Sequence, residues 1–91
     1  MKTSFKNSFL NDIKKIKDKA LLEKVKQTIL DVEKAETIQG IPRLKKLKGS
    51  NKNYYRITVG TYRLGVAIED DRVIFVVFDA RKDIYKHFPT N

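Results

Sequence analysis

The chain has 91 residues and a formal net charge of +9, with 20 lysine and arginine residues against 11 aspartate and glutamate residues. This length supports one hydrophobic core, so residues 1–91 are predicted to form a single domain. The absence of cysteine excludes disulfide bridges, thiolate nucleophiles and cysteine-based zinc sites. With one histidine and no glycine-rich phosphate loop, the sequence predicts neither a metal nor a cofactor.

The excess of positive charge implies an anionic partner, and charge alone allows nucleic acid, an acidic protein or an anionic membrane surface. The alternative is a merely solvated basic surface. The longest apolar run, residues 73–78, is six residues long, whereas a membrane-spanning helix needs about 18. Residues 1–8 also lack the apolar centre of a signal peptide. We therefore expect a cytoplasmic protein without a membrane partner.

Residues 9–32 carry apolar side chains at helical spacing. They are Phe9, Leu10, Ile13 and Ile16, followed by Leu21, Leu22, Val25, Ile29 and Val32. The pattern predicts two amphipathic helices in a hairpin, with residues 17–19 as the connection. We interpret the apolar stripe as a core-facing surface rather than a nucleic-acid interface.

The ends of these helices are marked by residues with known terminal preferences. Asn7 or Ser8 is predicted to cap the first helix, because short polar side chains accept hydrogen bonds from the first turn. Gly40 followed by Pro42 predicts the end of the second helix. Residues 43–53 are polar and basic, and we expect them to form a connector.

Lysine and arginine are distributed differently along the chain. Residues 1–48 hold twelve lysines and one arginine, whereas residues 49–91 hold three lysines and four arginines. Lysines suit solvated helix faces, while the rigid fork of arginine suits phosphate. The arginines of the second half are therefore the better functional candidates.

From Tyr54 onwards the hydrophobic period changes to two, which predicts β-strands. Strands are expected over residues 54–59 and 62–68, joined by a two-residue turn at Gly60-Thr61. Residues 73–78 are apolar on both faces and are expected inside the sheet. A further strand is expected near residues 3–6.

The turn assignment sets a register for the central hairpin. Val59 would face Tyr62, Thr58 would face Arg63, Ile57 would face Leu64, and Arg56 would face Gly65. The helices must cover the apolar face, so Arg56, Thr58 and Arg63 are predicted to project together from the opposite face. The small residues Gly65 and Ala67 are expected to leave space beside them, which predicts a cationic hollow.

Arg81 and Tyr85 follow the last strand and are expected to close this hollow. Arginines bind phosphate through paired hydrogen bonds and an aromatic ring stacks on an unpaired base, so the group suits single-stranded RNA. The structural alternatives are an ion pair of Arg63 with Glu69 or Asp79, an ion pair of Arg81 with Asp83, and simple packing of Tyr85.

Four parts of the chain also carry a recognisable pattern. They are Phe5 with Phe9, Ile13 and Ile16; Leu44-Lys45-Lys46-Leu47-Lys48-Gly49; residues 55–64; and Arg81-Lys82-Asp83-Ile84-Tyr85. In this order they resemble the first helix, basic connector, central hairpin and closing motif of the RelE/ParE superfamily of bacterial type II toxins. The resemblance implies an α+β fold, with an N-terminal strand and a helical hairpin packed on a small antiparallel sheet in the order β-α-α-β-β-β.

In the RelE branch, the resemblance implies a metal-independent endoribonuclease that cuts mRNA in the ribosomal A site by attack of the RNA 2′-OH, with an acidic antitoxin as partner. On matching positions, Arg63 would stabilise transition-state charge, Arg81 would serve the phosphate or leaving oxygen, and Tyr85 would orient or stack a base. Arg56 is the fourth catalytic candidate. The RNA-binding candidates are Lys45, Lys46, Lys48, Thr58 and His87.

Three positions depart from the RelE pattern. Arg56 and Thr58 stand where lysines are common, and Ala80 precedes Arg81 where many relatives have histidine. No obvious general base is left, so catalysis would depend on electrostatics, Tyr85 or His87. The alternative within the same fold is the ParE branch, which inhibits DNA gyrase and is no nuclease, and a third reading is a non-toxic nucleic-acid-binding module. The arginine-tyrosine closing motif favours the ribonuclease function, whereas the absence of an obvious general base favours gyrase inhibition.

Overall fold

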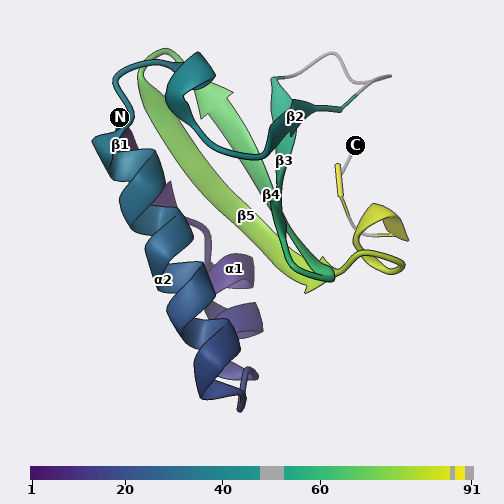
Figure 1. Ribbon diagram of the computed structural model, residues 1–91. Coiled ribbons are helices and arrows are strands. Elements are labelled where there is room, and N and C mark those ends of the chain that lie inside the picture. The colour runs from purple at the N-terminus through teal and green to yellow at the C-terminus, as the bar shows by residue number, and fades with distance from the viewer. Residues whose placement is uncertain (48–52, 87, 90–91) are drawn as a thin grey trace.

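Two helices and a five-stranded sheet make up the protein (Figure 1). The computed structural model describes residues 1–47, 53–86 and 88–89. The elements are, in chain order, β1 (Lys2–Phe5), α1 (Asn7–Lys14), α2 (Lys19–Lys34), η1 (Ile38–Gly40), β2 (Leu44–Lys46), β3 (Tyr54–Val59), β4 (Tyr62–Glu69), β5 (Arg72–Ala80) and η2 (Ile84–Lys86). This arrangement confirms the predicted α+β class. Among the described residues, no helix is long and apolar enough to cross a membrane.

The strands follow the spatial order β1-β5-β4-β3-β2. The last four form an antiparallel meander, as expected, while β1 joins β5 in parallel and makes the sheet mixed. Strand β5 lies between β1 and β4, which confirms the interior place predicted from its apolar run. Its burial is uneven, because Val73, Phe75 and Phe78 are buried in the core whereas Ile74, Val76 and Val77 are half-buried.

Strand β2 replaces part of the connector that was expected over residues 43–53, so that prediction is wrong for Leu44–Lys46. Its residues pair with Ile57, Arg56 and Tyr55 of β3. Only Leu44 packs against the core, whereas Lys45 and Lys46 are exposed. The sequence of β2 therefore shows no apolar alternation that would predict a strand. The strand is held in the sheet by its backbone pairing with β3.

The β3–β4 hairpin has the predicted register. Val59 pairs with Tyr62, Thr58 with Arg63, Ile57 with Leu64, and Arg56 with Gly65. The turn between them has Gly60 at φ 59°, in the left-handed region that glycine adopts without steric cost. The apolar face of this hairpin therefore points to the helices, and its polar face points away from them.

Both helices lie on one side of the sheet and bury its apolar face (Figure 1). The core includes Phe9, Val25, Val32, Ile57, Leu64, Val66 and Phe75. This confirms the core-facing interpretation of the helical stripe. Leu10 is an exception, because its side chain is 38% exposed next to the fully buried Phe9.

The helix ends differ from the predicted ones. Helix α1 begins at Asn7 after Lys6, and neither Asn7 nor Ser8 caps it, because the Ser8 hydroxyl donates to the Val76 carbonyl instead. Asp18 caps α2 by accepting hydrogen bonds from the amides of Ala20 and Leu21, at 2.9 and 3.3 Å.

Helix α2 ends at Lys34, ahead of the predicted stop at Gly40 and Pro42. Ala35 already has an extended backbone, and Gly40 belongs to η1. The Met1 amino group donates hydrogen bonds to carbonyls at this end of α2, including that of Glu33 at 3.0 Å. A cation is favourable there because the helix dipole places partial negative charge on its last carbonyls.

Side chains of α1 satisfy the edge of β5 beyond the point where β1 ends. Strand β1 pairs with residues 72–75 only. Further along, the Ser8 hydroxyl donates to the Val76 carbonyl and the Asp12 Oδ2 atom accepts from the Phe78 amide at 3.0 Å. Two short polar side chains thus take the hydrogen bonds that a sixth strand would otherwise make.

Replacing Asp12 with alanine should lower the free energy of unfolding by about 1–3 kcal/mol, because the partly buried Phe78 amide loses its acceptor. Asp12→Asn keeps an acceptor oxygen and should cost clearly less. Asn11→Ala, an exposed change on the same helix, is the control. Urea denaturation measures all three, and equal effects of Asp12→Ala and Asn11→Ala would contradict the expectation.

Candidate functional site

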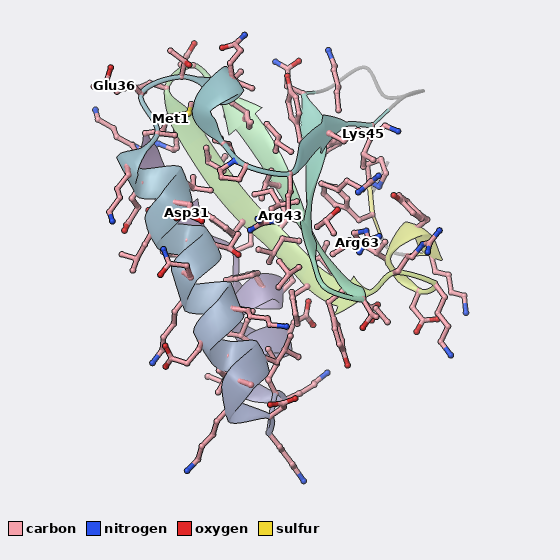
Figure 2. The ribbon with its side chains drawn as sticks, viewed as in Figure 1. Met1, Asp31, Glu36, Arg43, Lys45 and Arg63 are labelled. Atoms are coloured by element: carbon pink, nitrogen blue, oxygen red, sulfur yellow. The ribbon has the colours of Figure 1, made fainter. Side chains whose placement is uncertain are left out.

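Arg56, Thr58 and Arg63 lie on the sheet face opposite the helices, as the register predicts. Figure 2 shows Arg63 on the side of β3 that faces away from α2. The Arg56 Nη1 atom donates to the Thr58 hydroxyl at 2.9 Å. Arg56 is thereby held against the sheet, with Arg63 on the neighbouring strand.

The β3–β4 turn fixes two arginines at once. The Arg63 Nη1 atom donates to the carbonyls of Gly60 and Tyr62, each at 2.9 Å. The backbone amide of Arg81 donates to the Thr61 carbonyl, also at 2.9 Å. These bonds bring the residue after β5 to the same end of the hairpin as Arg63.

The other predicted catalytic residues, Arg56, Arg81 and Tyr85, lie within electrostatic range of Arg63. Burial lowers the pKa of Arg63, and the positive charges of Arg56 and Arg81 lower it further, whereas Tyr85 raises it. We call Arg56, Arg63 and Arg81 the arginine cluster. The structure thus brings all four predicted catalytic residues together, while their roles stay predictions.

No salt bridge joins the arginine cluster to an acid among the described residues, although Asp79 lies opposite Arg63 in the β4–β5 register. The salt bridges in this part of the chain join Lys2 to Asp71, Lys26 to Glu23, and Lys86 to Asp83. Asp83 therefore pairs with Lys86, and not with Arg81 as in the structural alternative. Three positive charges held close together repel one another, and a bound anion would relieve that repulsion.

Tyr85 lies in η2 and is 54% exposed. Its neighbour Ile84 is fully buried and anchors this short helix to the protein. A tyrosine with more than half its surface in solvent does not serve mainly as a core residue. Its ring is available to a ligand bound at the arginine cluster.

The space beside Gly65 is filled, which corrects the expectation of an open hollow there. A Cβ atom at Gly65 would lie 2.7 and 2.9 Å from two ring carbons of Phe88 and 2.6 Å from the Val77 Cγ1 atom. Phe88 is 1% exposed and also packs edge-on against Tyr54, with ring centroids 5.0 Å apart. Gly65 is therefore the socket for Phe88, and the arginine cluster lies next to this aromatic plug.

The lysines predicted to bind RNA do not all join the site. Lys45 pairs with Arg56 across β2 and β3, so it extends the cationic face. Lys46 pairs with Tyr55, whose side chain packs on the core, so Lys46 lies on the other face. Lys48 and His87 lie outside the described residues.

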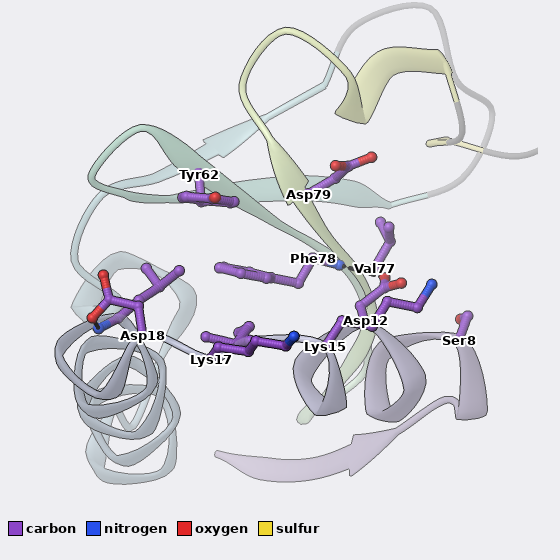
Figure 3. A pocket seen from close by; sticks show the side chains of 11 residues that line it. Ser8, Asp12, Lys15, Lys17, Asp18, Tyr62, Val77, Phe78 and Asp79 are labelled. Atoms are coloured by element: carbon purple, nitrogen blue, oxygen red, sulfur yellow. Dashed lines mark hydrogen bonds between the residues drawn. The ribbon is translucent and has the colours of Figure 1, made fainter.

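A pocket in the described part of the chain does not coincide with the predicted site. It has a volume of about 640 Å³ and lies between α1, the start of α2 and the ends of β4 and β5 (Figure 3). Tyr62 and Phe78 stack in it, with centroids 5.1 Å apart and an interplanar angle of 8°. None of the predicted site residues lines it.

Phe88 is the site-forming residue that the sequence reasoning missed. A glycine in the middle of a strand often marks the close approach of another group, and Gly65 carried that signal. We instead interpreted its small size as empty space.

The described residues also hold no group of three metal-ligating side chains.

A family model for the ParE toxin of the type II toxin-antitoxin system parDE matches residues 4–85. The chain belongs to this toxin family. Toxin RelE3 of Methanocaldococcus jannaschii is 34% identical over 90 residues, which are 98% of this chain and 100% of that toxin. The matched range of the ParE toxin model contains the arginine cluster and Tyr85, whereas Phe88 lies beyond it.

Solved structures of RelE/ParE superfamily toxins share this fold. The RelB-RelE antitoxin-toxin complex from Methanococcus jannaschii matches with a TM-score of 0.75 and 32% identity, covering 94% of this toxin and 99% of that chain. The RelBE2 toxin-antitoxin complex from Mycobacterium tuberculosis matches with a TM-score of 0.71 and 22% identity, covering 88% and 96%. The second likeness concerns the fold alone.

Gly65→Ala should destabilise this toxin by about 1–3 kcal/mol, because the added methyl group overlaps the Phe88 ring and the Val77 side chain. Gly40→Ala is the matched control, since its Cβ atom would meet Ala35 only at an ordinary 3.5 Å. Urea denaturation gives the stability. Hydrogen exchange at the Phe88 amide, which donates to the Ile84 carbonyl at 2.9 Å, reports whether the plug is released. Slow exchange at Phe88 in Gly65→Ala would contradict the socket interpretation.

Proposed function

We propose that this toxin is a ribosome-dependent, metal-independent endoribonuclease that cleaves mRNA in the ribosomal A site. The observation that carries the proposal is the arginine cluster, which forms no salt bridge among the described residues and lies within electrostatic range of the exposed Tyr85. Cations with a neighbouring aromatic ring match a phosphate with an unstacked base. The RelE3 relative supports the same activity.

The proposed reaction uses the RNA itself as nucleophile. The 2′-oxygen forms a bond to the adjacent phosphorus while the bond from phosphorus to the 5′-oxygen breaks. The 2′-hydroxyl loses a proton and the 5′-oxygen gains one, which yields a 2′,3′-cyclic phosphate and a 5′-hydroxyl. Negative charge builds up on the phosphorane between these states, and fixed cations lower its free energy.

Each member of the cluster has a role in this scheme. Arg63, fixed to the turn carbonyls, stabilises the phosphorane charge, and Arg81 binds the phosphate or the leaving oxygen. Arg56 adds charge and holds the Thr58 hydroxyl in place. Tyr85 stacks on or orients the base. Since arginine stays protonated and threonine is a poor base, the rate depends on charge and positioning more than on proton abstraction.

A second candidate function is inhibition of DNA gyrase, with no nuclease activity. The matching model is that of the ParE toxin, and the described members of the cationic face include no general base. Primer-extension mapping of translated mRNA, run beside a gyrase supercoiling assay, distinguishes the two. Ribosome-dependent cuts support the proposal, whereas supercoiling inhibition without cuts assigns the toxin to the gyrase function.

We also propose an acidic antitoxin as the partner and the cytoplasm as the location. The net charge of +9 favours an acidic partner, and the RelE of Methanococcus jannaschii was solved with its antitoxin RelB. Translating ribosomes and gyrase, the two candidate targets, are both cytoplasmic.

Arg63→Ala and Arg81→Ala should each lower ribosome-dependent cleavage by at least ~10²-fold, because each removes a charge directed at the phosphorane. The matched control is Arg72→Ala, an exposed arginine at the opposite end of the β4–β5 hairpin. Its cleavage rate should stay within about twofold of wild type, since a distant exposed charge is screened. Thermal unfolding of all variants checks that the fold is kept, and an equal loss in Arg72→Ala would point to nonspecific charge.

Tyr85→Phe and Tyr85→Leu separate stacking from the action of the hydroxyl. If the ring stacks on the base, Tyr85→Phe should keep most activity and Tyr85→Leu should lose ~10-fold or more, in line with a stacking contribution of about 1–3 kcal/mol per base. Single-turnover cleavage of A-site mRNA measures the rates. A large loss already in Tyr85→Phe would assign orientation or proton handling to the hydroxyl.

A further inference from the structure

A second, smaller pocket lies at the seam between α2 and the edge of β3. Its volume is about 350 Å³, and Lys24, Gln27, Thr28, Arg43, Val59 and Gly60 line it. In Figure 2, Arg43 lies between α2 and β3, whereas Arg63 lies on the other side of β3. The pocket is therefore on the opposite face of the strand from the arginine cluster.

The polar neighbours in this pocket are already bonded within the protein, but its two cations are not ion-paired. The Gln27 amide donates to Asp31 at 3.0 Å, and the Thr28 hydroxyl donates to the Lys24 carbonyl at 2.8 Å. Neither Lys24 nor Arg43 forms a salt bridge with an acid in the described part of the chain. The pocket thus presents unpaired positive charge.

Arg43 is held in place before any ligand arrives. Its Nε atom donates to the Thr58 carbonyl at 3.0 Å, and its own carbonyl accepts from the Thr58 amide at 3.3 Å. Its backbone has φ 60°, in the left-handed region that is uncommon for residues other than glycine. A local strain that the surrounding structure maintains is often found where a side chain must be presented in one orientation.

A fixed guanidinium beside an ammonium group matches a carboxylate. Arginine binds a carboxylate through two parallel hydrogen bonds, and with the Nε atom engaged, the two terminal nitrogens of Arg43 stay available for them. The volume admits an acidic side chain with part of its backbone. Preorganisation lowers the entropy lost on binding.

We propose that Arg43 and Lys24 form a carboxylate-binding pocket that takes an aspartate or glutamate side chain of the acidic antitoxin. The identity of the partner rests on the proposed function, whereas the preference of the pocket for a carboxylate does not. An antitoxin side chain bound here would hold the antitoxin on the face opposite the arginine cluster. RNA bound at the arginine cluster would therefore not compete for this contact.

Three variants test the pocket. Arg43→Gly removes the guanidinium and suits the left-handed backbone, so the fold should be kept. Lys24→Ala removes the second cation. Lys26→Ala is the matched control, because Lys26 lies on the same helix, is exposed and pairs with Glu23 at 3.6 Å. Thermal unfolding of each variant establishes that it is folded before binding is measured.

The first experiment titrates ¹⁵N-labelled toxin with hexaglutamate and, separately, with oligouridylate, while the Arg43 Nε and Gly60 amide resonances are followed. Hexaglutamate should shift both resonances in the wild type and in Lys26→Ala, with at least tenfold weaker binding in Lys24→Ala and Arg43→Gly, the latter followed at Gly60. Equal binding by all four proteins would overturn the proposal. Shifts caused by oligouridylate alone would assign the pocket to nucleic acid and overturn it as well.

The second experiment tests, as the candidate antitoxin, an acidic protein encoded next to the toxin gene. Calorimetry at two salt concentrations measures the affinity of the same four proteins for this gene product. Arg43→Gly and Lys24→Ala should bind at least tenfold more weakly than wild type, and Lys26→Ala within twofold. If the wild type binds this product and the pocket variants bind it equally well, the proposal is overturned. If the wild type does not bind it, the antitoxin assignment is wrong, and the hexaglutamate titration still decides whether the pocket recognises a carboxylate.

Discussion

The two-residue turn at Gly60-Thr61 is the constraint on which the site depends. Its left-handed glycine fixes the β3–β4 register, and the register decides which side chains face the helices. The same turn supplies carbonyls for the Arg63 side chain and the Arg81 backbone. A slip of one residue would therefore turn Arg63 towards the core and remove its carbonyl partners in one step. The fold and the arrangement of the charges are therefore both specified by this turn.

Thr58 connects two regions that would otherwise be independent. Its hydroxyl accepts from Arg56 on the arginine-cluster face, and its carbonyl accepts from Arg43 at the seam with α2. One residue of β3 thus organises cations on both sides of the sheet. Under the proposed function, an RNA substrate and an acidic antitoxin would bind on these two faces, so the two anions need not occupy the same place.

The parts predicted from sequence are those in which local pattern and tertiary structure agree. The helical stripe, the alternation in β3 and β4 and the glycine turn all depend on near neighbours, so the cationic face followed from them. Strand β2 was missed because its pairing is supplied by β3. The Phe88 plug was missed because it depends on a contact between Gly65 and a residue more than twenty positions away, which no local period encodes. The grouping of Arg81 with Arg63 was expected, whereas the turn carbonyls that enforce it were not.

Side chains of α1 occupy the part of the β5 edge where the backbone of a neighbouring strand would otherwise pair. An extended chain that approaches this edge finds the Val76 carbonyl and the Phe78 amide already engaged by Ser8 and Asp12. At the other edge, β2 is only three residues long and carries two exposed lysines. Backbone pairing with another chain is thereby disfavoured along β2 and along the part of β5 that β1 leaves open. Positions 8 and 12 are accordingly expected to favour short side chains with an oxygen in reach, a restriction on sequence that comes from the sheet edge.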